Sequence, residues 1–156
     1  VHIGVLKDGK IVDPFNPEDR NTCGKAHGTG LWEPALGYNR TGLFTAGFST
    51  AVPGFDAVKS GAARAATATP DQPLVLYGHA FYSEPGDQLI FTAEGPNGEI
   101  FRRDITLDDP QAEIFRAFGR KAPAAGWPAG AYRGYVRLKR GQEVLALRHA
   151  DIRVAP

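Results

Sequence analysis

The feature that most constrains the fold is a series of short apolar runs separated by turn signals, which fills the chain beyond Pro70. Residues 74–82 are apolar at both alternating positions, as a strand buried on both faces would be, and residues 87–94, 100–107 and 131–139 alternate apolar with polar side chains. Dipeptides such as Asn97-Gly98 favour the tight turns that join such strands. About seven short strands with a turn signal roughly every 8–12 residues predict an all-β sandwich.

Three stretches can be separated on this pattern. Residues 1–15 predict a β-hairpin, because Asp8-Gly9 lies between two short apolar segments and Pro14 cannot continue the pairing. Residues 16–42 are rich in Gly and Pro without a sustained period, and predict a long linker. Residues 43–156 predict an immunoglobulin-like or fibronectin-like β-sandwich. The expected fold class is therefore all-β, a sandwich preceded by a hairpin and a linker.

Two local features of the sandwich are less regular. Residues 55–66 are Ala-rich and favour one short helical turn, which Gly61 keeps from extending. The last stretch, residues 144–154, changes the face on which its apolar residues fall. One extra residue would restore the alternation, and we expect a β-bulge near His149-Ala150.

Composition and charge narrow the function classes. With 42% hydrophobic and 22% charged residues among 156, the chain is an ordinary globular sequence, and no apolar run reaches the roughly 18 residues of a membrane span. Residues 1–98 carry 7 Lys/Arg and 10 Asp/Glu, a balance of −3, and residues 99–156 carry 11 and 7, a balance of +4. A mildly basic half could favour anionic wall polymer or lipid headgroups, but a solvated sheet surface with outward Arg side chains fits it better. It is too weakly basic to indicate nucleic acid.

The order of residues at the start of the chain carries a resemblance. A His opens the first strand, Asp-Gly forms the turn, and Val-Asp-Pro ends the second strand; the matching positions are His2, Ile3, Gly4, Val5, Asp8, Gly9, Val12, Asp13 and Pro14. This order resembles the end of the catalytic domain of lysostaphin/LytM-type zinc endopeptidases, which cut peptide cross-links in bacterial cell wall. Because the motif is entered in mid-strand, we expect the chain to be a fragment of a longer protein.

The resemblance implies one metal ligand. It maps His2 onto the second His of the family's His-x-His motif, a zinc ligand, whereas the first His, which acts in catalysis, would precede Val1. The family's His-x-x-x-Asp, which gives two further ligands, has no counterpart here. A catalytic zinc needs three protein ligands, so we expect zinc in the intact parent, none in this fragment, and no activity from the fragment alone. Asp13 belongs to a structural turn in the family, and the resemblance assigns it no chemistry.

The remainder resembles, more loosely, the tail that follows this domain in some proteobacterial members, through Cys23-Gly24, Leu31-Trp32 and Gly126-Trp127-Pro128. Our first hypothesis is the C-terminal part of a secreted or periplasmic zinc endopeptidase acting on peptidoglycan cross-links. The sandwich then docks or positions substrate without catalysis of its own. The partners expected under this hypothesis are the missing upstream peptidase domain and peptidoglycan or envelope proteins, without nucleic acid and without a membrane span.

A second hypothesis comes from a different class of protein. The chain is a stand-alone immunoglobulin-like binding or adhesion module of the cell envelope, and the hairpin match is coincidence. Under this hypothesis, removing residues 1–14 changes neither stability nor binding.

Other chemically capable residues have simpler interpretations. Cys23 cannot form an internal bridge, and pairs with an upstream Cys or is a free thiol; with His27 it falls short of a four-ligand metal site. His79 lies among aromatic residues in a predicted strand and fits a satisfied core or interface histidine. The pair Asp108-Asp109 precedes Pro110 and indicates a turn. Leu31, Trp32 and Tyr38 could offer a stacking platform for sugar, but a buried anchor of the linker fits them better.

Overall fold

The computed structural model describes residues 3–18, 30–34 and 40–156. The chain divides into two compact units, Val1–Asn39 and Arg40–Pro156, each of which is described by itself. The first unit holds the predicted hairpin: β1 (Val5–Lys7) pairs antiparallel with β2 (Lys10–Val12). Asp8 and Gly9 join them with φ angles of 51° and 74°, as a type I′ turn requires. The hairpin prediction is confirmed.

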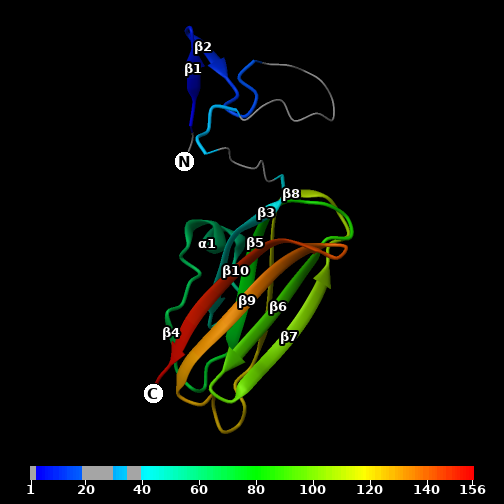
Figure 1. Ribbon diagram of the computed structural model, residues 1–156. Coiled ribbons are helices and arrows are strands. Elements are labelled where there is room, and N and C mark those ends of the chain that lie inside the picture. The colour runs from blue at the N-terminus through cyan, green and yellow to red at the C-terminus, as the bar shows by residue number, and fades with distance from the viewer. Residues whose placement is uncertain (1–2, 19–29, 35–39) are drawn as a thin grey trace. The chain divides into compact units, whose positions relative to one another are not determined.

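The second unit is a sandwich of two β-sheets (Figure 1). One sheet has three antiparallel strands in the order β3 (Gly42–Ser49), β5 (Leu74–Ser83), β8 (Gln111–Arg120). The other has five strands in the order β4 (Thr67–Ala68), β10 (Glu143–Val154), β9 (Gly130–Arg140), β6 (Gln88–Gly95), β7 (Gly98–Thr106). Only β4 runs parallel to its neighbour, β10. A short helix, α1 (Phe55–Ser60), lies in the connection from β3 to β4 and ends at Gly61, whose φ is 82°.

The connections make this an immunoglobulin-like sandwich. The chain passes back and forth between the sheets, and β9–β10 and β6–β7 are hairpins within the five-stranded sheet. Tyr132, near the start of β9, donates a hydrogen bond of 2.8 Å from its hydroxyl to the carbonyl of Pro128, the tyrosine corner that marks many such domains. Trp127 packs against that ring at 6.2 Å and is itself buried. The fold class predicted from the sequence is confirmed.

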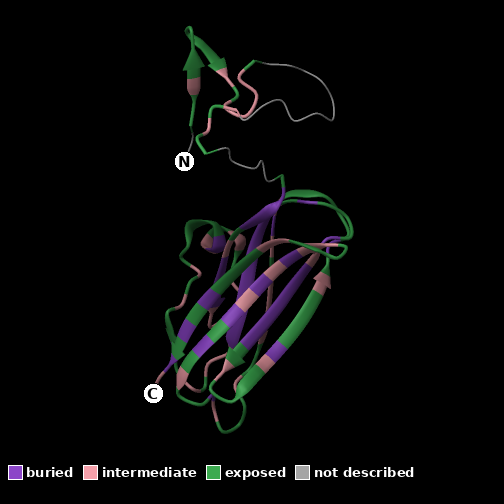
Figure 2. Ribbon diagram, viewed as in Figure 1, coloured by how far each residue is buried: buried purple, intermediate pink, exposed green. Residues whose placement is uncertain are grey.

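The core lies between the two sheets, and the strands bury alternate residues toward it (Figure 2). As predicted, β5 is the central strand of its sheet and is buried on both faces. The sheets approach closely where Gly134 of β9 faces Leu76 of β5, because a Cβ at Gly134 would lie 2.6 Å from a Leu76 methyl group. The largest side chains that are almost wholly buried in this core are Tyr132, Phe48, Phe91, Leu43, Leu74, Leu76, Leu89, Leu107 and Leu138.

Three details differ from the sequence predictions. The bulge in β10 lies at Leu145, between Val144 and Ala146, and not near His149-Ala150. Ala146 therefore packs against the core, and Leu147 faces outward and is 47% exposed. A second bulge in β3 leaves Phe44 unpaired. The short strand β4 was not predicted, since two residues form no period and their pairing with β10 is a tertiary contact.

Candidate functional site

The one metal ligand predicted from the sequence, His2, lies outside the described residues, as do Cys23 and His27. Within the described ranges, no three His, Cys, Asp or Glu side chains come together in a way that could hold a metal ion. Nothing further about zinc follows from this, because the resemblance places the other ligands upstream of the chain. Asp13 has the structural role that was expected: its Oδ1 accepts a hydrogen bond of 2.9 Å from the Phe15 N–H, closing a turn after β2.

Several large apolar side chains of the hairpin region are exposed to solvent. Leu6 and Ile11 lie directly opposite each other in the register, and they are 68% and 83% exposed. Ile3 is 64% exposed.

After β2, the chain is held by contacts to residues 31 and 32. Phe15 packs on the half-buried Trp32 at 5.6 Å, and the Leu31 N–H donates a hydrogen bond to the carbonyl of Pro14. Trp32 thus serves as an anchor, as expected, whereas Leu31 is 53% exposed and Tyr38 lies outside the described residues.

In the sandwich, an aromatic ledge formed by Phe44, Phe81 and Tyr82 lies on the outer face of the three-stranded sheet. The Phe44 and Phe81 rings lie 4.6 Å apart, and Tyr82 meets Phe81 edge-on at 6.4 Å. Phe44 is 53% exposed and Tyr82 is 63% exposed. Gly42 makes room for the ledge, because a Cβ there would approach the Phe81 ring to 2.8 Å. Three adjacent rings, two of them largely open to solvent, are an unusual surface for a small domain.

The backbone holds the two exposed rings outward. Phe44 is the extra residue of the β3 bulge, which turns its side chain onto the outer face beside His79. Tyr82 has a φ of 47°, one of two positive values among non-glycine residues in the described chain. A tyrosine in this region costs free energy, on the order of 1 kcal/mol, unless its surroundings impose the conformation.

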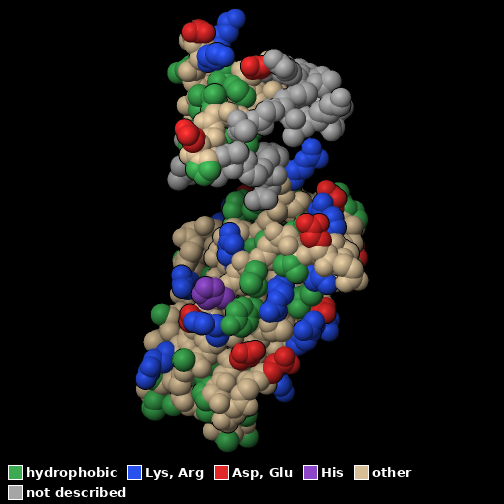
Figure 3. Space-filling model, viewed as in Figure 1, with side chains coloured by type: hydrophobic (Ala, Val, Ile, Leu, Met, Phe, Trp, Pro, Cys, Tyr) green, Lys and Arg blue, Asp and Glu red, His purple; other side chains and the backbone are tan. Residues whose placement is uncertain are grey.

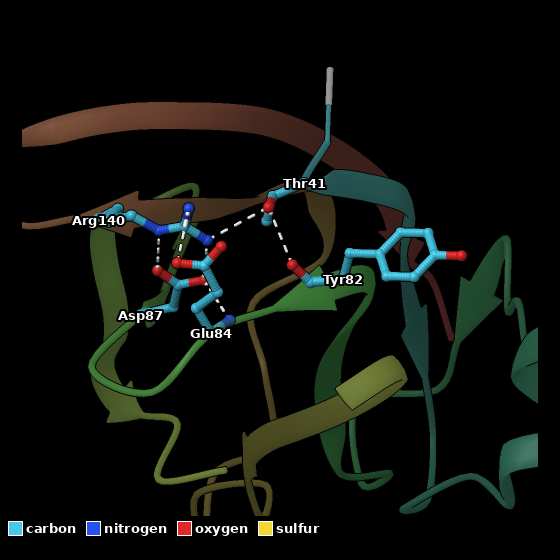
Figure 4. Close-up of polar contacts among 5 residues, drawn as sticks. All are labelled: Thr41, Tyr82, Glu84, Asp87 and Arg140. Atoms are coloured by element: carbon cyan, nitrogen blue, oxygen red, sulfur yellow. Dashed lines mark hydrogen bonds and ion pairs between the residues drawn. The ribbon is translucent and has the colours of Figure 1, made fainter. Parts of the chain in front are cut away.

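An ion pair between Asp87 and the partly exposed Arg140 imposes it (Figure 4). Asp87 is wholly buried, and its carboxylate accepts hydrogen bonds from Arg140 Nε at 2.8 Å and Nη2 at 2.9 Å. Arg140 Nη2 also donates to Thr41 Oγ1 at 3.2 Å, and that hydroxyl donates to the Tyr82 carbonyl at 2.9 Å. Glu84 adds an ion pair to Arg140 at 3.1 Å. The ring of Tyr82 points away from these ions.

The electrostatics of this cluster keep Asp87 ionised. Burial alone would raise the pKa of its carboxyl group, but hydrogen bonds from Arg140 and from the Glu84 N–H hold the pKa below its ordinary value. The Asp87 carboxylate in turn raises the pKa of Arg140. The cluster links β9, the β5–β6 turn and the start of β3, so it fixes the end of the sandwich that carries the ledge. The side chains of the cluster form hydrogen bonds and ion pairs with one another, which fits a structural role and not a catalytic one.

His79 lies directly behind the ledge and departs from its prediction. It is 6% exposed, as a core histidine should be, but its Nε2 has no hydrogen-bond partner among the described residues. Phe44 covers its ring at 4.8 Å and Phe55 of α1 meets it perpendicularly at 5.4 Å. Burial lowers the pKa of His79, which Glu113 opposes and Lys59 assists. The imidazole is thus buried against two phenylalanine rings, and within the described chain its Nε2 lacks the hydrogen bond that was expected.

Sequence reasoning missed the ledge and its support. One local signal could have indicated the bulge in β3. In a regular strand Leu43 points to the opposite face from Ala46 and Phe48, yet all three are buried. Nothing local to Tyr82 indicated a positive φ, and the Asp87–Arg140 pair joins residues 53 positions apart. The Asp108-Asp109 pair is exposed in a loop, as predicted.

Comparisons with known proteins bear on the fold. No protein-family model matches the sequence, and no curated protein matches it. Among solved structures, the chain is similar to the CARDB domain of the PF1109 protein from Pyrococcus furiosus, solved in complex with di-metal ions, with a TM-score of 0.45 and 12% identity over 76% of this chain and 97% of that one. It is also similar to the C-terminal domain of wzt, with a TM-score of 0.44 and 10% identity over 78% and 77% of the two chains. The fold assignment rests on the strand topology and the tyrosine corner.

Proposed function

We propose that the sandwich is a non-catalytic binding module of a bacterial cell-envelope protein, and that it docks a protein partner on the aromatic ledge. The observation that carries the proposal is that two backbone irregularities hold Phe44 and Tyr82 outward. One is the β3 bulge at Phe44, and the other is the positive φ of Tyr82, which the Asp87–Arg140 pair supports through Thr41. Neither ring fills the core. Exposed aromatic side chains are typical of the centre of protein–protein interfaces.

The test compares binding of the full chain to isolated envelope fractions with that of a ledge variant, Phe44→Ser/Tyr82→Asn. Asn tolerates the positive φ at position 82, so the fold should persist. Loss of one central aromatic anchor costs about 2 kcal/mol, so the bound fraction should fall by at least about tenfold. A matched control, Leu31→Ser/Val52→Ser, removes apolar residues that are 53% and 75% exposed elsewhere.

Protease treatment of the envelope fraction should abolish binding, because the proposed partner is a protein. Undiminished binding by the ledge variant would refute the proposal, and so would binding that survives proteolysis. Thermal unfolding of each variant reports whether the sandwich is intact.

A second candidate function is favoured by the hairpin. The order His2, Asp8-Gly9 and Val12-Asp13-Pro14 resembles the end of lysostaphin/LytM-type catalytic domains, and Leu6 and Ile11 expose apolar surface that a further domain could cover. The intact parent would then be a zinc endopeptidase of the periplasm or cell exterior, with His2 as a zinc ligand. Peptidoglycan cross-links would be its substrate, and the ledge would dock the peptidase domain or an envelope partner.

The second candidate is tested on the complete gene product. It should contain a His directly before Val1 and a His-x-x-x-Asp further upstream, bind about one zinc per chain, and lose that zinc in the His2→Ala variant. A complete product without zinc would leave the binding module as the function of this chain.

A further inference from the structure

The outer face of the five-stranded sheet, opposite the ledge, carries a second surface. The strand register places outward side chains of β9 and β10 beside each other: Lys139 opposite Val144, and Arg137 opposite Leu147. Tyr135 is the next outward residue of β9. We name these five residues the amphipathic patch. Figure 3 shows this face, with Lys and Arg side chains interspersed among hydrophobic ones.

The cations of the patch are available for a ligand. Within the described chain, neither Arg137 nor Lys139 has a carboxylate partner, whereas Arg133 further along β9 is neutralised by Asp151 at 2.6 Å and 3.1 Å. Arg102 on β7 likewise pairs with Asp104 at 3.4 Å. Of the outward cations of β9, Arg137 and Lys139 therefore lack a carboxylate partner in the described part of the chain, and both lie toward the turn shared with β10.

Arg137 is also held in place. Its Nη1 donates to Thr92 Oγ1 at 3.3 Å, and its guanidinium lies 5.6 Å from the centre of the Tyr135 ring. Ile90, opposite Arg137 in the register, is only 6% exposed although it faces outward. Arg137 is thus oriented by neutral groups that leave its charge uncompensated. A guanidinium in that state binds phosphate oxygens with paired hydrogen bonds.

The apolar residues of the patch favour a lipid bilayer over a soluble polyanion as the anionic partner. Val144 and Leu147 are 52% and 47% exposed, and both lie beside the cations. A soluble polyanion would contact the cations and gain little from two exposed aliphatic side chains. A bilayer offers anionic headgroups to the cations, the interface to Tyr135, and the acyl boundary to Val144 and Leu147.

We infer that the amphipathic patch binds the surface of an anionic lipid bilayer. The ledge and the patch lie on the outer faces of different sheets, so the sandwich can hold a protein partner on one face while the other rests on the membrane. In the described part of the chain, no helix has the length and apolarity to cross a bilayer.

The experiment is flotation of the full chain with vesicles of phosphatidylcholine alone or mixed equally with phosphatidylglycerol. Binding should require phosphatidylglycerol and weaken as salt rises from about 0.01 M to about 1 M, because the screening length falls from roughly 30 Å to 3 Å. The variant Arg137→Gln/Lys139→Gln should lose roughly thirtyfold in affinity. The variant Val144→Ser/Leu147→Ser should bind more weakly and with a larger salt dependence, since only the charges remain.

The matched control is Arg116→Gln/Lys121→Gln, which removes two exposed cations outside the five-stranded sheet and should bind as the unmodified chain does. Equal binding to both vesicle types, no binding at all, or an equal loss in the control would overturn the inference. Complete competition by soluble polyphosphate, with the Val144→Ser/Leu147→Ser variant unaffected, would also overturn it and indicate a polyanion site. The ledge variant should float normally, which separates this test from that of the proposed function.

Discussion

At the scale of single residues, the Asp87–Arg140 pair shows how a buried charge can define a surface. Its carboxylate is wholly buried and accepts three hydrogen bonds, two from Arg140 and one from the Glu84 N–H at 2.9 Å. Such a pair is not a source of net stability by itself, because desolvation offsets most of its attraction. What it provides here is a fixed position for Thr41 and, through that hydroxyl, for the Tyr82 backbone.

Removing Arg140 should be costly, because Asp87 would remain charged, buried and unpaired. We expect Arg140→Ala to lower the free energy of unfolding by about 3 kcal/mol in urea titrations. The double variant Asp87→Asn/Arg140→Ala should recover part of that loss, since it removes the orphaned charge. A double variant no more stable than Arg140→Ala would contradict the ion-pair explanation.

The lowered pKa of Asp87 also predicts that the folded state loses stability at low pH. Its folded-state pKa lies below the ordinary value of 3.8, so its contribution to stability is complete above that pH and is lost as the pH falls through the folded-state pKa. Unfolding midpoints measured between about pH 5 and pH 2 should fall less steeply for Asp87→Asn than for the unmodified chain.

His79 predicts a dependence in a higher pH range. Burial holds its folded-state pKa below the ordinary 6.5, so the unfolded state binds more protons once the pH drops toward and below that value. Stability should therefore decline as the medium is acidified from about pH 8 to about pH 5. His79→Leu should remove that part of the slope, whereas His149→Gln, which leaves His79 in place, should retain it. An unchanged slope in His79→Leu would show that the imidazole is not the titrating group.

At the scale of elements, the sandwich depends on strands that come close at small residues. Gly134 of β9 faces Leu76 of β5 and Phe48 of β3, with a virtual Cβ only 2.6 Å and 2.9 Å from their side chains. We expect Gly134→Ala to destabilise the sandwich by about 1–3 kcal/mol through overpacking, measured by chemical denaturation. Gly54→Ala is the matched control, because Gly54 has an ordinary φ of −76° and a Cβ there meets nothing within 4 Å. If Gly54→Ala loses as much stability as Gly134→Ala, crowding is not the cause.

At the scale of the whole molecule, the two compact units predict independent folding of the sandwich. The main hydrophobic core of the described chain begins at Leu43 and includes no residue of the first unit. A chain beginning at Arg40 should therefore unfold cooperatively, with a midpoint within about 2 °C of the full chain, because a change of 1 kcal/mol shifts the midpoint by about 2–4 °C or more. A larger drop in calorimetry would show that residues 1–39 stabilise the sandwich.

The sequence by itself determined the fold class and most strands of this protein. Alternation in β6, β7 and β9, apolar runs on both faces of β5, and the Asp8-Gly9 turn are local signals, because side-chain direction in a strand repeats every two residues. The assignment of Asp13 to a turn depends on the same kind of local signal. His2 as a zinc ligand stays a prediction, since it rests on residue order and lies outside the described residues.

Only the tertiary structure decided which surfaces are built for contact. The bulges at Phe44 and Leu145 depend on what each strand packs against, and a shift of one residue reverses every side chain beyond it. For this reason Leu147 is exposed in the patch and Phe44 in the ledge. The positive φ of Tyr82 is imposed by Thr41 and Arg140, which lie 41 and 58 positions away. Such contacts have no local period, because they are fixed by how the two sheets close on each other.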